Sequence, residues 1–563
     1  MRSLARRGIE VHVAPFDFRA PALRSRRITR AHWLPYYLGD GASWLEQFRS
    51  LVREERFDLV IPCDERSILP LNRHRQEFES FTNLAIPGSE AIDILYDKHN
   101  TRELARSVGI PVAPGRMLLK DDTAGSLMQE FGLPLVLKPR RSYRLESLYV
   151  RSNALVIMDA KSILRALHGV TPDQFIVEGF FEGFGVGVSV LAKHGRILQA
   201  FQHERLHESH LVGGSSYRRS VPVEPALEEA CEKTLRGLQY TGLAMFEFRK
   251  RRSSDEFILL EINARPWGSL PLPVSLGVDF PYFWYQLLKH DVEVPRVRYR
   301  YRVYGRNLMQ DYHYLRFQLS RLRHAPVKML LMAAGWLLSF RQFFIGRETW
   351  DALVLDDPIP GVIELSRIFE RLTTIVSKWT AGPHSLRRRR ARRALITALG
   401  KSDDKQLLIF VCQGNICRSP FAALQLERFL QAGSKKPQIV SAGMLPIEGR
   451  PSPQTALVSA RERGVDLNAH KSQHLSPILA ESASAVIIFD DRNRQSIKAR
   501  YPDSKTPVLR LSDLGGGHDA KNGIYDPNGY DLTTFRATYA AITDCNRAIA
   551  ELIRSRLSQR PRD

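Results

Sequence analysis

Apolar and polar residues alternate with strand and helix periods through the first ninety residues. Apolar runs at 9–14 and 57–62 predict strands, and a 3.6-residue period over 44–55 predicts a helix between them. Strands separated by helices are typical of a parallel sheet, so we expect an α/β domain over residues 1–90. The chain opens in a helical segment, so we expect the usual first strand of such a domain to be missing.

Two strand patterns follow between residues 242 and 306. LAMFEF and EFILLEIN are joined by a polar turn at 250–255, which predicts an antiparallel hairpin. Residues 296–304 alternate arginine with apolar residues. A half-buried strand with one solvated basic face explains this alternation about as well as a nucleic-acid patch does.

Residues 329–340 (MLLMAAGWLLSF) are uncharged, but a bilayer span needs about 20 such residues. We expect a packed core helix here. The alternative is a helix at a membrane surface, because basic residues flank the segment on both sides. Farther on, the basic run of 385–405 indicates a linker. We therefore expect a helical and basic linker region at 311–405, with the main domain boundary at its end.

Composition limits the class of protein. The chain has 563 residues, 44% apolar and 25% charged, as expected for several folded globular domains. The net charge of +22 suits nucleic acid, an anionic membrane surface or phosphorylated substrates, and alone it supports no specific nucleic-acid partner. Five cysteines and no signal peptide favour free thiols in a reducing cytoplasm.

The most informative motif is VCQGNICRSP at 411–420, which lies between a buried strand pattern (407–411) and a helical pattern. Backbone N–H groups of the loop formed by Gly414, Asn415, Ile416 and Cys417 would converge above Cys412 and bind three phosphate oxygens. The same positive field favours the thiolate form of Cys412, a nucleophile for phosphorus, and the planar fork of Arg418 would clamp the equatorial oxygens.

This loop resembles the active-site loop of the low molecular weight protein tyrosine phosphatases, and the resemblance extends over 406–563. It implies a doubly wound four-stranded parallel sheet and a phosphatase that needs no cofactor. By the resemblance, Cys412 is the nucleophile, Arg418 binds phosphate, Ser419 donates to the thiolate, Asn415 shapes the loop and Asp526 is the general acid. Further matches, expected to be scaffold groups, are Ser441, Gly443, His470, Asp490 and Asn493.

The residues expected around the phosphatase loop leave more than one class of substrate open. Family members usually place aromatic residues where this chain has Asn528, Gly529 and Ile447, with Tyr530 nearby. A phosphorylated protein carrying phosphotyrosine is the leading substrate, and a small phosphomonoester is the competitor. An arsenate reductase is a minor alternative, since beyond Cys417 only Cys545 could relay a disulfide.

The first half contains no Walker loop, so any phosphate site there must be built from other residues. Lys138 ends the apolar strand pattern LPLVLKP, Lys98 opens a helix, and Glu178 ends the strand pattern FIVE. Glu261 and Asn263 are two residues apart and share a strand face, with Glu247 on the neighbouring strand. Three such oxygen ligands suit Mg²⁺ when ATP phosphates complete its shell.

Together these residues resemble the ATP-grasp superfamily, over about 91–310. The resemblance implies ATP and Mg²⁺ as cofactors and an α/β domain before the ATP-grasp fold. It places Lys98 and Lys138 on phosphate oxygens, Glu178 at adenine and Arg265 at the acyl phosphate or γ-phosphate. Glu247, Glu261 and Asn263 would bind the metal.

The sequence therefore predicts an α/β multidomain, bifunctional cytoplasmic enzyme. One half would hydrolyse phosphomonoesters, and the other would join an unknown carboxylate to an unknown amine through an acyl phosphate. The alternative is a phosphatase regulated by an ATP-binding module that does not turn over.

Overall fold

The computed structural model describes residues 1–17, 20–37, 40–148, 151–167, 169–208, 214–322, 325–380, 384–400, 406–430, 436–515, 523–530 and 532–557. The chain folds into two compact units, Met1–Thr373 and Thr374–Asp563. Helix α15 (Ile359–Thr380) contains the division between them. The predicted linker at 385–405 lies within the second unit.

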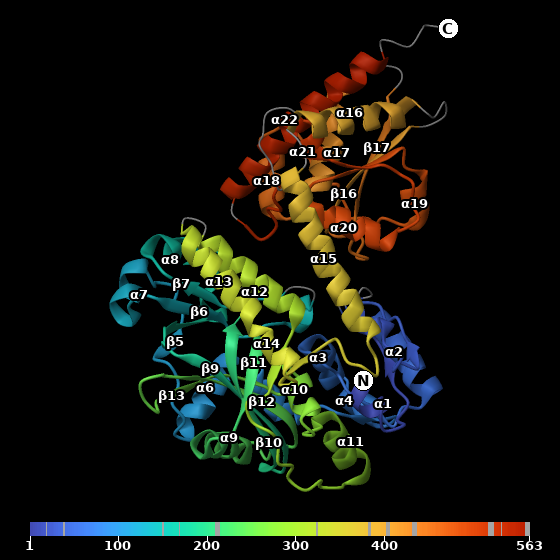
Figure 1. Cartoon of the computed structure of the whole chain (residues 1–563). Coiled ribbons are helices and arrows are strands. Elements are labelled where there is room, and N and C mark those ends of the chain that lie inside the picture. Colours follow the sequence, from blue (N-terminus) through green and yellow to red (C-terminus); the bar gives the residue numbers. More distant parts are fainter. Residues whose placement is uncertain are drawn as a thin grey trace. The chain divides into compact units, whose positions relative to one another are not determined.

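The first unit contains two short pairs of strands and two larger sheets (Figure 1). Two short parallel pairs near its start are β1 (His12–Val13) with β2 (Arg30–Ala31), and β3 (Leu59–Val60) with β4 (Asn83–Leu84). An antiparallel sheet of order β5-β8-β6-β7 is built from β5 (Gly115–Met117), β6 (Leu135–Pro139), β7 (Leu155–Ile157) and β8 (Phe175–Gly179).

The other large sheet has seven strands in the order β13-β12-β9-β10-β11-β14-β15. Its strands are β9 (Phe184–Lys193), β10 (Arg196–Glu208), β11 (Ser215–Val221), β12 (Gly242–Lys250), β13 (Phe257–Asn263), β14 (Tyr304–Arg306) and β15 (Glu348–Trp350). The predicted hairpin is confirmed, because β12 and β13 pair antiparallel with Glu247 directly opposite Glu261.

The helices of this unit are short to medium in length. They are α1 (Arg2–Ala5), α2 (Ala42–Glu55), α3 (Glu65–Arg73), α4 (Arg75–Glu79), α5 (Ser89–Leu95), α6 (Lys98–Ser107), α7 (Ala124–Phe131), α8 (Ala160–Leu167), α9 (Pro225–Gly237), α10 (Pro271–Ser275), α11 (Phe280–His290), α12 (Leu308–Arg321), α13 (Pro326–Ser339) and α14 (Arg341–Phe344).

The two faces of the seven-stranded sheet differ because side chains alternate along each strand. One face carries Val186, Val188 and Phe246, which are buried with residues of α5, α6 and α9. On the opposite face, Leu243 and Met245 pack with α10 and α11. Polar residues occupy the remainder of this second face, which places the candidate ATP site there.

The start of the chain is fastened to residues near the end of the first unit. Arg2 Nε donates to Asp357 Oδ2 at 2.7 Å, and Ser25 Oγ donates to the same oxygen at 2.6 Å. Arg6 pairs with Asp356 at 2.6 Å. Because these ion pairs join segments about 350 residues apart, they close the unit into one body.

Two expectations for the segment after the hairpin are wrong. Residues 296–303 form no strand, and only Tyr304–Arg306 pairs as β14. The alternation instead reflects an extended segment whose Val297 and Tyr299 pack on the core while Tyr299 bonds Val221 through its hydroxyl. Nor is 329–340 a packed core helix: residues 329–339 lie in α13, which has no buried residue, and Phe340 follows it.

The second unit contains a four-stranded parallel sheet of order β17-β16-β18-β19, as predicted. Its strands are β16 (Leu407–Cys412), β17 (Gln438–Gly443), β18 (Ala485–Ile488) and β19 (Val508–Arg510). The helices are α16 (His384–Gly400), α17 (Arg418–Phe429), α18 (Gln454–Arg461), α19 (Pro477–Ser482), α20 (Asp491–Arg500), α21 (Leu511–Leu514) and α22 (Leu532–Leu557). Leu395 and Leu399 of α16 are buried in the same core as α17 and α22.

No helix among the described residues is both long enough and apolar enough to span a bilayer.

Candidate active sites

Cys412 ends β16, an interior strand of the parallel sheet whose six residues are all buried. The chain leaves β16 for β17 on one side, while β18 pairs on the other side. Loops at the carboxyl end of such a strand diverge and leave a crevice, the usual ligand position in an open α/β sheet. The next helix, α17, begins at Arg418, so its N-terminal N–H groups also face this crevice.

Asn415 holds the loop between strand and helix. Its φ of 52° lies in the left-handed region, which asparagine tolerates better than most residues. Its buried amide nitrogen donates to Ser419 Oγ and Ser441 Oγ, each at 2.9 Å, while its amide oxygen accepts from the backbone of Gln473 at 2.8 Å. A Cβ on Gly443 would lie only 3.0 Å from Asn415 Cβ, so glycine permits this close approach.

The Cys412 sulfur lies inside this network. It accepts from the backbone N–H of Asn415 at 3.2 Å and lies 3.0 Å from Ser419 Oγ. Since the Ser419 oxygen already accepts from Asn415, its own proton is left to donate, to the sulfur or to the Ala442 carbonyl at 3.3 Å. The geometry therefore offers two donors to a thiolate at this position.

Arg418 is fully buried, and carboxylates hold both ends of its guanidinium fork. Nη1 donates to Asp490 Oδ2 at 2.7 Å and to the Ile524 carbonyl at 2.9 Å, and Nη2 donates to Asp526 Oδ2 at 2.6 Å. Burial by itself would lower the pKa of Arg418, but the anions around it, Asp526 first, raise the pKa above its usual value. Arg418 therefore stays charged in the crevice.

The outer parts of the loop are also fixed. Arg450 donates to the Gly414 carbonyl at 2.6 Å, and Tyr539 donates to the Cys417 carbonyl at 3.1 Å. Ile416 is half-buried against the core of the unit. Burial raises the pKa of the Cys417 thiol, and the adjacent Cys412 adds to the shift, so Cys417 stays protonated.

His470 supports the loop from the opposite side. Its Nε2 lies 2.7 Å from the Asn415 carbonyl, which requires that this nitrogen carry a proton and donate it. Burial lowers the pKa of the imidazole, and the hydrogen bond opposes this shift only in part. A neutral His470 is therefore the supporting form.

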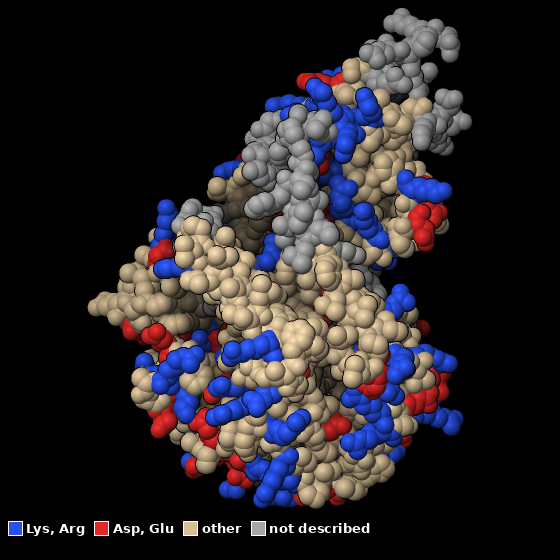
Figure 2. Space-filling view, viewed as in Figure 1, with Lys and Arg blue, Asp and Glu red and all other residues tan. Residues whose placement is uncertain are grey.

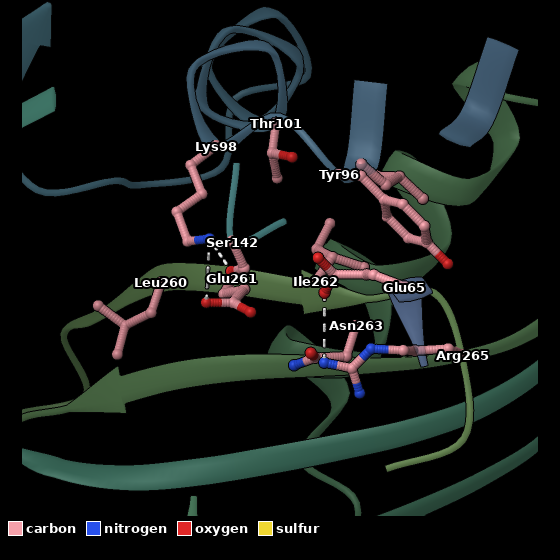
Figure 3. A pocket seen from close by; sticks show the side chains of 11 residues that line it. Glu65, Tyr96, Lys98, Thr101, Ser142, Leu260, Glu261, Ile262, Asn263 and Arg265 are labelled. Carbon is pink, nitrogen blue, oxygen red and sulfur yellow. Dashed lines mark hydrogen bonds and ion pairs between the residues drawn. The ribbon is translucent and has the colours of Figure 1, made fainter. Parts of the chain in front are cut away.

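In the first unit, a pocket gathers several of the predicted ATP-site residues (Figure 3). Lys98, Glu261, Asn263 and Arg265 line it. Lys98 Nζ donates to Ser142 Oγ at 3.0 Å and lies 3.9 Å from Glu261 Oε2, and Figure 3 shows the ammonium directed at both groups. Burial would raise the pKa of Glu261, but Lys98 and Arg265 outweigh it, so the pKa of this carboxyl is lowered and the group is anionic.

The three predicted metal ligands lie on one face of the β12–β13 hairpin. Asn263 donates its amide nitrogen to Glu247 Oε1 at 3.1 Å, which leaves the amide oxygen for a cation. Glu247 also pairs with Arg205 of β10 at 2.8 Å. Two carboxylates and an amide oxygen are the donor set that Mg²⁺ prefers, so these residues fit the metal.

Lys138 and Glu178 lie beside this pocket in the antiparallel sheet, but neither lines it. Lys138 Nζ pairs with Glu178 Oε2 at 2.6 Å, and Arg102 binds the other carboxylate oxygen. Glu178 is therefore satisfied by two cations, and a nucleotide phosphate reaching Lys138 would compete with this carboxylate.

Sequence reasoning missed several residues at both sites. Glu65 of α3 enters the ATP pocket, where its Oε1 lies 3.5 Å from Arg265 Nη2. Arg102 forms an ion pair with Glu178, and Ser142 accepts a hydrogen bond from Lys98. Arg450 donates a hydrogen bond to the phosphatase loop. None belongs to a local motif, so no signal in the sequence marked them.

Comparison with known proteins separates the two units. Residues 407–559 match the family model of low molecular weight phosphotyrosine protein phosphatases, and residues 171–307 match a model described as ATP-grasp in the biosynthetic pathway with Ter operon. Both resemblances drawn from the sequence are thereby confirmed.

Individual relatives match mainly the second unit. A probable low molecular weight protein-tyrosine-phosphatase, EpsP of Ralstonia nicotianae, is 31% identical over 128 residues, which cover 23% of this chain and 82% of the relative. A protein-arginine-phosphatase of Geobacillus stearothermophilus is 32% identical over 130 residues, covering 23% and 84%. Among solved structures, N5-carboxyaminoimidazole synthetase of Staphylococcus aureus complexed with ADP matches with a TM-score of 0.44 at 16% identity, covering 57% of this chain and 82% of that one.

Proposed function

The chain belongs to the low molecular weight phosphotyrosine protein phosphatase family through residues 407–559, and it also carries an ATP-grasp domain. We propose that its second unit hydrolyses a phosphomonoester through a cysteinyl-phosphate on Cys412. One observation carries the proposal. The Cys412 sulfur lies at the bottom of the anion-binding loop, with hydrogen-bond donors at 3.2 and 3.0 Å and the paired Arg418 and Asp526 above it.

The reaction follows in two displacements. The Cys412 thiolate attacks phosphorus, a sulfur–phosphorus bond forms, and the bond to the leaving oxygen breaks as Asp526 gives that oxygen a proton. Asp526 then takes a proton from water as the water attacks phosphorus, so inorganic phosphate leaves and the thiolate is restored. The Ser419 hydroxyl stabilises the sulfur anion whenever it is released.

Substrate binding must rearrange one ion pair. A phosphate dianion in the loop competes for Arg418, whose fork contacts Asp490 and Asp526. The Asp490 side chain is 17% exposed and the Asp526 side chain is 42% exposed, so Asp526 is the carboxylate that moves. That movement takes Asp526 from the guanidinium toward the leaving oxygen that it protonates.

Two substitutions test the mechanism in the full chain with p-nitrophenyl phosphate and EDTA. Cys412→Ser should abolish turnover, because a hydroxyl cannot form the nucleophilic anion at neutral pH, whereas the matched Cys417→Ser should retain most activity. Asp526→Ala should slow hydrolysis of phenyl phosphate by about 10² to 10⁴-fold and that of p-nitrophenyl phosphate less, because p-nitrophenolate leaves without a proton. Equal losses on both substrates would exclude Asp526 as the acid.

Phosphotyrosine is the leading substrate. Tyr525 and Tyr530 flank Asp526 in sequence, are both more than half exposed, and meet edge to face with ring centroids 5.3 Å apart. Such a pair can pack on an aromatic ester. The likeness to a protein-arginine-phosphatase adds phosphoarginine as a second competitor beside a small phosphomonoester. Tyr530→Ala should raise KM for a phosphotyrosine peptide and leave KM for a phosphoarginine peptide unchanged, and the reverse pattern would favour phosphoarginine.

For the first unit, the pocket of Lys98, Glu261, Asn263 and Arg265 favours binding of ATP with Mg²⁺, followed by ligation of a carboxylate to an amine. Glu247, Glu261 and Asn263 would hold the metal, whose charge neutralises the phosphates when it is bound. Lys98 would bind phosphate oxygens, and Arg265 would steady the transferred group.

ATP binding and turnover separate the ligase from a regulatory module. Glu261→Gln should weaken ATP binding in Mg²⁺ but not in EDTA, because one anionic ligand is lost. In the Cys412→Ser background, a ligase should release ADP only when a carboxylate is supplied. ATP binding without ADP from any carboxylate pool would favour a module that regulates the phosphatase.

A further inference from the structure

Helix α13 (Pro326–Ser339) presents an apolar stripe to solvent. Val327, Leu330, Leu331, Leu337 and Leu338 are between 63% and 70% exposed and follow the i, i+3, i+4 spacing of one helix face. The following helix α14 and its end continue the stripe with Phe344 and Ile345, which are 83% and 60% exposed. Several adjacent large apolar residues at such exposure indicate an interaction surface.

The opposite face of α13 is fixed to the body of the first unit. Trp336 Nε1 donates to Asp311 Oδ2 at 2.7 Å, and Ser339 Oγ accepts from Arg306 Nη2 at 2.8 Å. The Phe340 ring packs on the Arg306 guanidinium at 4.2 Å. Because Arg306 and Asp311 are completely buried, this face cannot turn outward without breaking buried ion pairs. The outward direction of the stripe is therefore built into the fold.

The charges around the stripe have one sign. No aspartate or glutamate occurs from residue 312 to residue 347, although acidic residues occupy about one position in nine over the whole chain. The same stretch carries six basic residues, namely Arg316, Arg321, Arg323, Lys328, Arg341 and Arg347. All of these are exposed except Arg323, which lies outside the described residues. In Figure 2 the surface over α13 is almost entirely uncharged, and basic side chains lie at its margins.

We propose that α13 and α14 lie flat in the interface of an anionic lipid bilayer and tether the first unit to it. The exposed leucines would enter the boundary between headgroups and acyl chains, and the flanking arginines and lysine would contact lipid phosphates. A helix of this length extends about 21 Å, which suits a position along the surface and not across it. A second copy of the chain is a poorer occupant, because it would oppose basic residues to basic residues with no carboxylate between them.

Vesicle flotation of the full chain tests the proposal. The protein should float with vesicles of phosphatidylcholine containing phosphatidylglycerol, and far less with phosphatidylcholine alone or at high salt. Leu331→Gln with Leu338→Gln should reduce partitioning by about tenfold or more, since glutamine keeps the helix but loses the apolar side chains. Lys328→Gln and Arg341→Gln should each reduce it roughly fivefold on anionic vesicles.

A matched control is Ile478→Gln, which removes an isolated isoleucine, 81% exposed, from the second unit and should leave flotation unchanged. Circular dichroism and thermal melts confirm that each variant folds. Two results would overturn the proposal. Equal flotation of the double leucine variant and the unchanged chain would show that another surface binds lipid. Absence of flotation with anionic vesicles would exclude lipid as the occupant, and a dimer that the leucine variant converts to a monomer would then assign the stripe to a second copy.

Discussion

Asn415 is the residue at which the phosphatase loop can be tested most sharply. Its amide makes three hydrogen bonds inside the unit while its backbone is held at a φ of 52°. Asn415→Ala removes all three bonds, each worth about 1 kcal/mol, and leaves the Gln473 N–H unpaired. Alanine in a left-handed conformation adds about 1 kcal/mol of strain. The free energy of unfolding of this unit should therefore fall by roughly 3 to 5 kcal/mol in total.

This loss should appear in two measurements on the full chain. The temperature at which half of the phosphatase activity is lost should fall by about 10 °C, given about 2 to 4 °C per kcal/mol for a unit of this size. Below that temperature, kcat should still fall by about 10²-fold, because the sulfur and its donors are displaced from each other. Asn415→Gly should recover about 1 kcal/mol of stability by relieving the strain, but none of kcat.

Asn546→Ala is the control that separates stability from chemistry. Asn546 is equally buried in the same unit and donates to the Ala422 carbonyl at 2.9 Å and to Gln425 at 3.2 Å. Its loss should lower the inactivation temperature and leave kcat unchanged at low temperature. If Asn415→Ala and Asn546→Ala reduced kcat alike, the reasoning that Asn415 positions the nucleophile would be refuted.

Three further predictions address charges. Burial lowers the pKa of His470, so below about pH 6.5 the unfolded state binds more protons than the folded state. The contribution of His470 to stability should therefore be complete above that pH and fall as the pH drops toward the pKa of the folded state. His470→Gln should flatten this dependence in thermal melts between pH 5 and 8. Asp490→Asn should reduce kcat/KM about 10 to 100-fold by freeing the Arg418 fork, and an unchanged value would mean that the Ile524 carbonyl suffices. Arg306→Met should destabilise the first unit by about 3 to 5 kcal/mol, since the buried carboxylates of Asp311 and Glu348 both lose their arginine partner, and adding Glu348→Gln should restore part of the loss in chemical unfolding.

The phosphatase loop was predictable because its chemistry is local in sequence. Cys412 and Arg418 are six positions apart on one strand–loop–helix segment, so their mutual placement needs no knowledge of the remaining chain. The parallel sheet followed from the resemblance. The β12–β13 hairpin was equally visible, because its two strands and turn are consecutive.

Other features depend on contacts that no sequence period encodes. Glu65 approaches Arg265 across 200 positions, and Arg102 meets Glu178 only because α6 packs near β8. The alternation at 296–304 indicated that Val297, Tyr299 and Val303 face the core, but Tyr301 is exposed, and the pattern could not show that 296–303 forms no strand. For α13, an uncharged apolar run signals burial in general, and only the fold revealed that the described residues of the first unit bury no residue of this helix.

The ion pairs between Arg2 and Asp357 have a consequence for synthesis on the ribosome. Their two residues are separated by 355 positions. At roughly 5 to 20 residues per second, the first helix waits about 20 to 70 s before its partner exists. During that interval Arg2 lacks its carboxylate partner, and Ser3 gains its own acceptor, Asp279, only partway through the wait. Completion of the first unit therefore depends on a late event, the emergence of residues 351–357, which precedes translation of the phosphatase.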